Sequence, residues 1–332
     1  MGYEKELEVA VAAVRDACRV CRTVQADLVT AATIEKKDKS PVTVADFASQ
    51  AVVCAALVEA FPTDRVVGEE AATALRDGDG AADLRAKVAA AVRSIRGAET
   101  SEEAVLDAID HGGWTPPAGG ADRFWTLDPI DGTKGFLRGE QYAVALGLIV
   151  DGRVVLGVLG CPNLSVGDGD ARGVLMTAVR GAGATLVALD DPNAAVHPVQ
   201  VAQVTETAGA RFCESVESGH SDQGSASRIA VHLGITAEPY RIDSQCKYAA
   251  VARGDASIYL RLPTRADYQE KIWDHAAGMI VVEEAGGRVT DIDGNDLDFA
   301  RGRTLEKNQG VIATCGPIHD RVVAVVREVL DR

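Results

Sequence analysis

Five short apolar segments between residues 124 and 189 constrain the fold of this chain more than any other feature. They cover residues 124–127, 143–150, 154–159, 173–179 and 184–189. The turn sequences Asp151-Gly152 and Gly181-Ala182-Gly183 each separate two of them. Apolar runs of this length with glycine-containing turns between them are typical of β-hairpins. We therefore predict one antiparallel sheet in this part of the chain.

Two helices and a short strand are predicted before this sheet. Residues 4–24 carry apolar side chains four and three residues apart, which is the spacing of one helix face. A second helix with the same spacing follows the polar loop 36–41, and Pro62 closes it. The apolar positions are Leu7, Val11, Val14, Cys18 and Cys21 in the first helix and Phe47, Ala51, Cys54, Val58 and Phe61 in the second. The predicted strand covers residues 65–68 and leads directly into Glu69 and Glu70.

Residues 71–120 are rich in Ala, Gly and Asp, and we interpret them as an insertion. Two surface helices are predicted inside it, near 81–95 and 101–110.

After about residue 203 the pattern changes to alternating helices and strands. Helices are predicted at 226–234 and 274–285, and strands at 256–262 and 287–292. The change predicts two lobes, an α+β lobe over 1–203 with the antiparallel sheet and an α/β lobe over 204–332.

The charge balance argues against two classes of partner. The chain has 332 residues and a net charge of −15, from 49 acidic and 34 basic residues. Such a surface repels nucleic acid and anionic membranes, so we expect a small-molecule substrate. The amino terminus has neither a basic lead nor an apolar stretch, which predicts a cytoplasmic protein, or an organellar one if a transit peptide has been removed. We expect a monomer.

The seven cysteines favour reduced thiols over a disulfide framework, because they are odd in number and scattered. Cys18 and Cys21 form a C-x-x-C pair, yet both fall on the apolar face of the first helix, and no second pair completes a zinc site. We interpret them as packing residues. Redox regulation stays open as an alternative.

The densest chemical signal is Asp128-Pro129-Ile130-Asp131-Gly132-Thr133, directly after an apolar strand. Pro129 stiffens the backbone, so the two carboxylates can converge while Ile130 offers its carbonyl oxygen. Gly132 permits a tight turn and exposes N–H groups to an anion. Oxygen ligands in this arrangement suit a hard divalent cation such as Mg²⁺. An ordinary Asp-Gly turn is the alternative interpretation.

Three further acids support the metal hypothesis. Glu69 stands at the end of a strand, Asp274 where a helix begins, and Asp46 near the start of the second helix. Each also has an ordinary explanation. Glu69 could be a solvated acid, Asp274 a helix N-cap and Asp46 an exposed helical acid. His275 is interpreted as structural, because oxygen-rich magnesium sites seldom recruit imidazole. The acidic run 291–296 is interpreted as a turn, since its glycine stands fourth and not sixth as in a calcium loop.

These motifs resemble a known family. The segments Gly68-Glu69-Glu70, Asp128 to Thr133 and Trp273-Asp274-x-Ala276-Ala277-Gly278 are similar to those of the lithium-sensitive, magnesium-dependent phosphatases of the inositol monophosphatase superfamily. Longer stretches are similar to its bisphosphate nucleotidase branch, and they are 40–46, 66–70, 124–141, 213–217, 243–248, 259–263 and 268–278. The resemblance runs from about residue 5 to the carboxyl terminus and is weakest over 71–120.

The resemblance implies a fold and a set of metal ligands. The fold is a five-layer αβαβα sandwich of the inositol monophosphatase and fructose-1,6-bisphosphatase type, with the site between two lobes. Two or three Mg²⁺ ions are implied. Their ligands fall on Glu69, Asp128, the carbonyl of Ile130, Asp131 and Asp274. Asp46 and Thr133 would orient the attacking water.

The resemblance also implies the substrate. Contacts with it fall on Gly132, Thr133, His220, Ser244, Lys247 and Arg261. Without the resemblance, Lys247 and Arg261 would be interpreted as a solvated surface pair. The implied reaction is hydrolysis of the 3′-phosphate of adenosine 3′,5′-bisphosphate to AMP, with 3′-phosphoadenylyl sulfate as a second substrate and sulfur assimilation as the context. Two alternatives stay open: a phosphatase for inositol monophosphate or inositol 1,4-bisphosphate, and a nucleotide sensor without turnover.

Overall fold

The computed structural model describes residues 2–31, 40–77, 80–117, 120, 122–167, 169, 171–191, 193–216, 223–263, 265 and 267–331. The helices in this part of the chain are α1 (Glu4–Ala31), α2 (Ser40–Ala60), α3 (Thr73–Arg76), α4 (Ala81–Arg96), α5 (Glu102–His111), α6 (Thr133–Leu137), α7 (Gln223–Leu233), α8 (Cys246–Ala252), α9 (Ala276–Glu284) and α10 (His319–Val329). Short 3₁₀ turns cover η1 (Thr207–Gly209) and η3 (Ile272–Asp274).

The strands form two sheets among the described residues. The first, sheet A, contains β1 (Arg65–Gly68), β2 (Arg123–Asp131), β3 (Ala143–Val150), β4 (Arg153–Ser165), β5 (Arg172–Val179), β6 (Gly183–Ala188) and β7 (His197–Val199), side by side in chain order. The second, sheet B, contains β8 (Phe212–Glu214), β9 (Tyr240–Arg241), β10 (Ile258–Arg261), β11 (Arg288–Thr290) and β12 (Val311–Thr314), in the order β11-β12-β10-β8-β9. The predicted antiparallel sheet is confirmed, and β1 is added to its edge in parallel with β2.

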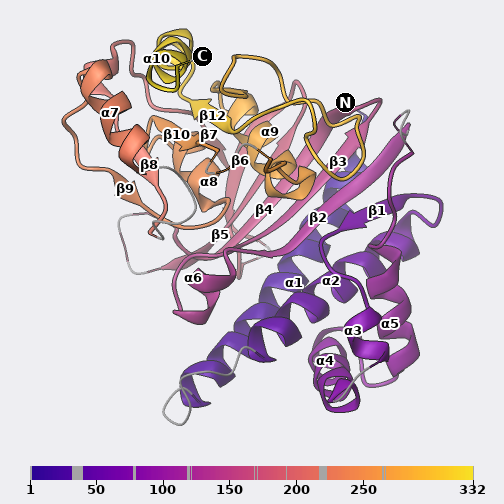
Figure 1. The fold of residues 1–332 in the computed structure, drawn as a ribbon. Helices are drawn as coiled ribbons and strands as arrows, with labels where there is room; N and C mark the ends of the chain where they lie inside the picture. Colours follow the sequence, from indigo (N-terminus) through magenta and orange to yellow (C-terminus); the bar gives the residue numbers. More distant parts are fainter. Residues whose placement is uncertain are drawn as a thin grey trace.

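The layers follow the predicted order (Figure 1). Helices α1 and α2 lie on one face of sheet A, and α9 lies on the other face against β3, β4 and β5. Helix α8 packs between α9 and sheet B, where it contacts β8 and β10. Helices α7 and α10 contact each other on the outer side, and α10 packs on β12. The five-layer mixed α/β fold is therefore confirmed.

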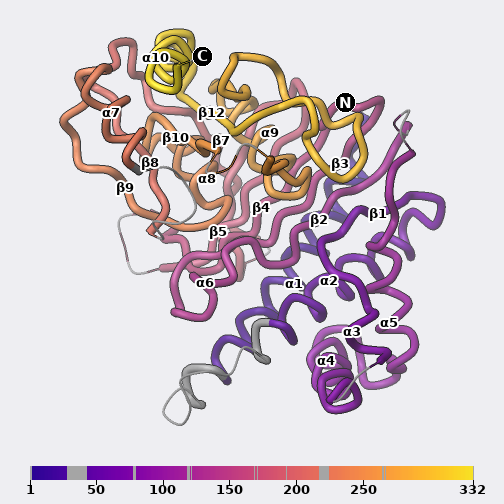
Figure 2. Tube along the Cα trace, viewed as in Figure 1, coloured from indigo at the N-terminus to yellow at the C-terminus, as the bar shows by residue number. Residues whose placement is uncertain are grey.

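The chain trace passes once from one sheet to the other (Figure 2). Sheet A is complete by Val199, and sheet B begins at Phe212. Helix α9 contacts strands of both sheets, so the packing is continuous across the boundary. The division into lobes 1–203 and 204–332 stays a prediction.

Several element bounds differ from those expected. Helix α1 continues to Ala31, well past residue 24, and α2 begins at Ser40, so the end of the predicted polar loop is helical. A proline is tolerated at that point because the first N–H groups of a helix have no partner within it. The helices expected near 81–95 and 101–110 are α4 and α5. The helix expected from 274 begins at Ala276, after the 3₁₀ turn η3.

Helix α2 is the central helix of its layer. Its segment Thr43–Ala60 has the length and mean hydropathy, 1.4, of a membrane-spanning helix, yet 67% of that segment is buried inside the fold. It packs against α1, α4, α5 and β2. Core packing on several sides accounts for its apolar character.

Close packing of α9 on sheet A predicts a sensitive position at Gly157 in β4. A Cβ atom there would lie 2.4 Å from Cγ2 of Ile280 and 2.9 Å from the carbonyl oxygen of Ala277. We expect Gly157→Val to lower the free energy of unfolding by about 1–3 kcal/mol, because the added methyl groups would push α9 away from sheet A. Chemical denaturation followed by circular dichroism measures this. Gly167→Ala, with open space around its Cβ position, is the matched control and should change little.

Candidate metal and phosphate site

Five acidic side chains from four separate elements converge where sheet A meets α2 and η3. Strand β1 pairs in parallel with β2, with Gly68 opposite Leu127, so Glu69 follows β1 beside Asp128. Asp46 lies on α2, Asp131 ends β2, and Asp274 ends η3. The charges of all four other acids raise the pKa of Asp128. The structure thus brings together the acids that the sequence identified separately.

The bulge in β2 gives Asp128 and Asp131 their spacing. The pairing of β2 with β3 shifts register between these two residues, so Pro129 and Ile130 interrupt the regular ladder. The Ser49 hydroxyl donates to the Pro129 carbonyl at 2.9 Å and holds the bulge against α2. The Asp128 side chain is buried, and its Oδ1 has no hydrogen-bond partner among the described residues. A buried carboxylate oxygen without a donor is a suitable ligand for a cation.

Burial and the charges of neighbouring acids raise the pKa values of four acids in the cluster. Burial raises the pKa of Asp128 well above its usual range, and the charges of Glu69 and Asp131 raise it further. Glu69 is exposed at the edge of the cluster, yet partial desolvation and the charge of Asp274 raise its pKa to about 8. The pKa of Asp131 rises to about 6, mainly through burial. A bound divalent cation would reverse these shifts, because it stabilises the ionised carboxylates.

Burial also raises the pKa of Asp46 well above its usual range, and the charges of Glu70 and Glu69 add to this effect. A carboxylate with a raised pKa is better suited to accept a proton at neutral pH than an ordinary one. This environment fits the water-orienting role expected of Asp46.

Gln50 fixes the turn that carries Glu69, and no sequence pattern predicts this role. Its buried amide accepts from the Glu70 N–H at 3.0 Å and donates to the Glu70 carbonyl at 2.8 Å. The same NH₂ group donates to Ile109 of α5 at 2.9 Å. A Cβ atom at Gly68 would lie 2.5 Å from the Gln50 Oε1, so a larger residue there would displace the amide that holds this turn.

Gln245 connects Asp131 with the segment that carries Asp274. Its backbone N–H donates to Oδ2 of Asp131 at 2.5 Å. Its side chain donates to the carbonyl of Trp273 at 2.9 Å and accepts from the N–H of Gly278 at 3.1 Å. Asp131 at the end of β2 and Asp274 at the end of η3 therefore depend on one residue for their relative position.

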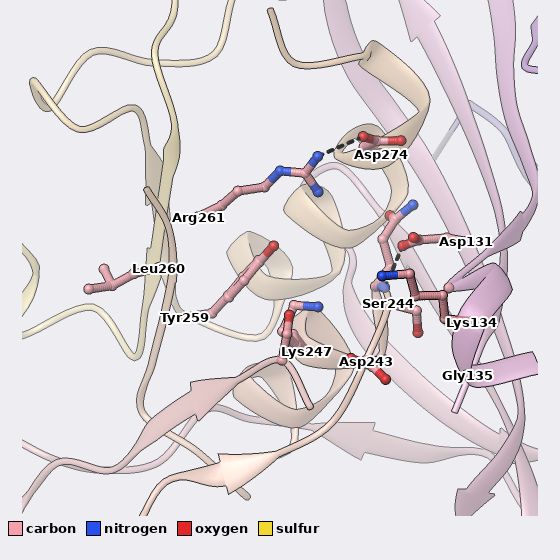
Figure 3. Close-up of a pocket in the computed structure, with 13 residues that line it drawn as sticks. Asp131, Lys134, Gly135, Asp243, Ser244, Lys247, Tyr259, Leu260, Arg261 and Asp274 are labelled. Atoms are coloured by element: carbon pink, nitrogen blue, oxygen red, sulfur yellow. Dashed lines mark hydrogen bonds and ion pairs between the residues drawn. The ribbon is translucent and has the colours of Figure 1, made fainter. Parts of the chain in front are cut away.

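A cleft with cationic groups opens beside the acids (Figure 3). Lys247 and Arg261 line it together with Asp131 and Asp274, and the Tyr259 side chain lies between the two cations. Lys247 is buried, and burial lowers the pKa of its amine while Asp131 raises it. The interpretation of Lys247 as a solvated surface residue is wrong.

Gly132 and Ser244 line the same cleft and touch each other closely. Gly132 has φ +93°, and a Cβ atom there would lie 2.7 Å from the Cβ of Ser244. Ser244 itself has φ +65°, a strained value for a residue with a side chain. Thr133 is exposed at the first position of α6. His220 lies outside the described residues.

Arg261 is held by two carboxylates. Its Nε lies 2.7 Å from Oε2 of Glu270, and its Nη2 lies 3.1 Å from Oδ2 of Asp274 and donates to the Tyr268 hydroxyl at 3.2 Å. The side chain is 23% exposed, so the guanidinium still faces the cleft. Asp274 therefore touches both the acid cluster and the cationic side of the cleft (Figure 3).

His275 belongs to the support of Arg261. The imidazole is fully buried, with Nδ1 2.7 Å from the Tyr248 hydroxyl and Nε2 3.1 Å from Glu270. In the neutral ring Nε2 carries the hydrogen, because a carboxylate can only accept. Glu270, Asp274 and His275 lie close enough together to hold a metal ion. The Arg261 guanidinium already supplies a positive charge to Glu270 and Asp274. This geometry agrees with the structural interpretation of His275.

Comparisons with known proteins assign the chain to a protein family. The profile described as the inositol monophosphatase family matches residues 3–331. The chain belongs to the inositol monophosphatase family. The family resemblance inferred from the motifs is thereby confirmed.

Curated relatives in this family are similar over almost their whole length. A protein of Emericella nidulans is 46% identical over 354 residues, covering 99% of each chain. One of Schizosaccharomyces pombe is 43% identical over 348 residues, covering 100% of this chain and 98% of its own. Both are named 3′(2′),5′-bisphosphate nucleotidase.

Solved structures agree on the fold. An inositol monophosphatase from Anabaena has a TM-score of 0.62 at 21% identity and covers 99% of this chain and 97% of its own. An IMPase from Thermotoga maritima has a TM-score of 0.64 at 19% identity, with 98% of each chain covered. At these identities the likeness supports the family fold alone.

The raised pKa of Glu69 predicts a pH-dependent stability in the absence of metal. A carboxyl group whose folded-state pKa lies above its unfolded value stabilises the fold while protonated, and this contribution is lost as the pH rises from about 4.5 to about 8. Glu69→Gln removes this pH-dependent loss of stability, because the amide does not ionise. Measured by denaturation in chelator, we expect the variant to gain about 1 kcal/mol over the wild type between pH 5 and pH 8, after allowing for solvent screening. A difference independent of pH would contradict the shift. Glu99→Gln, a glutamate far from the cluster in the sequence, is the control.

Proposed function

We propose that this chain is a magnesium-dependent phosphatase that hydrolyses the 3′-phosphate of adenosine 3′,5′-bisphosphate to give AMP and phosphate. The observation that carries the proposal is the cluster of five acids beside a cleft lined by Lys247 and Arg261. Relatives named 3′(2′),5′-bisphosphate nucleotidase, at 46% and 43% identity over the whole chain, support the choice of substrate.

The residues present fit divalent cations. Glu69, Asp128, Asp131, Asp274 and the carbonyl of Ile130 offer only oxygen atoms, which is the ligand type that Mg²⁺ prefers. The unpartnered Oδ1 of Asp128 and the raised pKa of its carboxyl group both indicate that a positive charge would be stabilising at this point. When bound, Mg²⁺ would supply a nucleophile from water at neutral pH and offset the charge of the phosphate.

The chain's own groups supply orientation and proton transfer. Asp46 and the Thr133 hydroxyl would orient the attacking water, and the raised pKa of Asp46 suits it to receive a proton. Gly132 lines the cleft, and the N–H groups that follow it at the start of α6 would donate to the cleaved phosphate. Phosphoryl transfer needs little covalent help from a protein, so positioning and charge compensation carry most of the catalysis.

The second half of the substrate would occupy the cationic side of the cleft. Lys247 and Arg261 are the groups that would hold the 5′-phosphate or the adenosine, with Ser244 beside them. A buried lysine and a guanidinium fixed by Glu270 lose little freedom when they bind an anion. The same contacts would accept 3′-phosphoadenylyl sulfate as a second substrate.

The first test compares substrates. We expect phosphate release from adenosine 3′,5′-bisphosphate to exceed that from AMP or inositol 1-phosphate, and to stop in chelator. Asp131→Asn, which removes one predicted ligand charge, should lower kcat at least about 100-fold while the protein still folds. Preference for inositol 1-phosphate would keep the metal chemistry and overturn the substrate. Tight nucleotide binding without turnover would make the chain a sensor.

Arg261 offers a second test, directed at the substrate. Loss of a charge-assisted contact costs about 1.5–3 kcal/mol, so Arg261→Ala should raise KM for adenosine 3′,5′-bisphosphate about 10- to 100-fold. The effect on inositol 1-phosphate, which has no second anionic group, should be smaller. Arg265→Ala is the control, because Arg265 is 67% exposed and pairs only weakly with Asp267 at 3.6 Å. Equal losses on both substrates would show that Arg261 does not contact the nucleotide.

A further inference from the structure

Arg303 ties together three segments that are far apart in the sequence. Its Nη2 donates to the Gly68 carbonyl at 2.5 Å, across 235 residues. Its Nη1 donates to the Trp114 carbonyl at 3.1 Å, across 189 residues. The guanidinium carbon lies 4.7 Å from the centre of the Trp273 ring. One half-buried side chain thus contacts the end of β1, the segment before β2 and the turn η3.

Two of these contacts stand next to predicted metal ligands. Gly68 directly precedes Glu69, and Trp273 directly precedes Asp274. The backbone around Arg303 is fixed in addition, because its carbonyl accepts from Ile272 at 3.2 Å and the Leu305 N–H donates to Glu270 at 2.8 Å. The loop that carries Arg303 is therefore paired along η3 while its side chain reaches across to β1.

The charge of Arg303 also interacts with Glu69. Burial lowers the pKa of the guanidinium, and the charge of Glu69 raises it. The positive charge of Arg303 therefore lies near the Glu69 carboxylate. A guanidinium remains protonated even where burial disfavours its charge.

The shape of the group matters as much as its charge. Two separate N–H groups of one planar fork reach two main-chain carbonyls, and the flat face lies over an indole ring. A lysine ammonium is a compact point charge and cannot make this combination of contacts. Arg303→Lys therefore keeps the charge but loses the geometry.

We propose that Arg303 is a positioning residue of the metal centre, which fixes the carboxylates of Glu69 and Asp274 relative to each other without being a ligand. The inference rests on the proposed metal site. Groups that orient metal ligands from outside typically change metal affinity about 10- to 100-fold when they are replaced.

Metal binding of the full-length chain tests the inference without relying on turnover. Mn²⁺ is titrated into the wild type, Arg303→Lys and Arg303→Met, with free Mn²⁺ followed by electron paramagnetic resonance. We expect both variants to raise the dissociation constant at least about tenfold. We also expect saturating Mg²⁺ to restore most of kcat in Arg303→Lys, with KM for the substrate unchanged. Arg301→Met is the matched control, because Arg301 is exposed and pairs with Asp298 at 3.3 Å.

Denaturation in chelator separates positioning from simple support of the fold. We expect the metal-free stability of Arg303→Lys to remain near that of the wild type. If both folded variants bind Mn²⁺ as tightly as the wild type, or if Arg301→Met loses as much affinity, the inference is wrong. If Arg303→Met fails to fold, Arg303→Lys alone decides. If the wild type binds no divalent cation, the proposed function fails first and the inference fails with it.

Discussion

Mutual repulsion among five carboxylates is the constraint on which the rest of this structure depends. Asp128 is buried with the charges of Glu69, Asp131, Asp274 and Asp46 around it, and its pKa rises accordingly. Burying unpaired charge is costly, and the cost falls when a cation or hydrogen-bond donors compensate it. A fold that keeps these acids together must therefore hold them through other residues. The elements that carry the acids, α2, β1, β2 and η3, would otherwise be driven apart.

The residues that hold the acids are polar and act mainly through the main chain. Gln50 fixes Glu70, Gln245 fixes Trp273 and Asp131, and Arg303 fixes Gly68. Amides neither gain nor lose a proton near neutral pH, and a guanidinium stays charged, so their hydrogen bonds persist when the acids change protonation. Gln50 and Arg303 contact main-chain atoms beside Glu69 and leave its carboxylate oxygens available, whereas the Gln245 N–H occupies Oδ2 of Asp131 and leaves Oδ1. The carboxylates are thus oriented by groups that would not compete for a metal ion.

Local patterns in the sequence predicted much of the fold and the acid cluster, because each signal depends on near neighbours. The strands of sheet A, the helices α4 and α5 and the Asp128 to Thr133 motif all belong to this kind. Gln50, Gln245 and Arg303 could not be found in this way, because their partners lie across 20 to 235 residues. The start of α2 at Ser40 was missed because its apolar spacing begins only at Phe47.

The position of Arg261 links the acid cluster to the cationic side of the cleft. Its guanidinium is bound by Glu270, which His275 and Tyr248 hold in turn, and it also touches Asp274. A carboxylate shared between a cation site and a guanidinium cannot change its charge or position for one without affecting the other. The chain has a net charge of −15, so the positive charges of Lys247 and Arg261 would make this cleft more attractive to an anionic substrate than the rest of the surface. Under the proposed function, substrate attraction and metal binding would therefore be properties of one connected network.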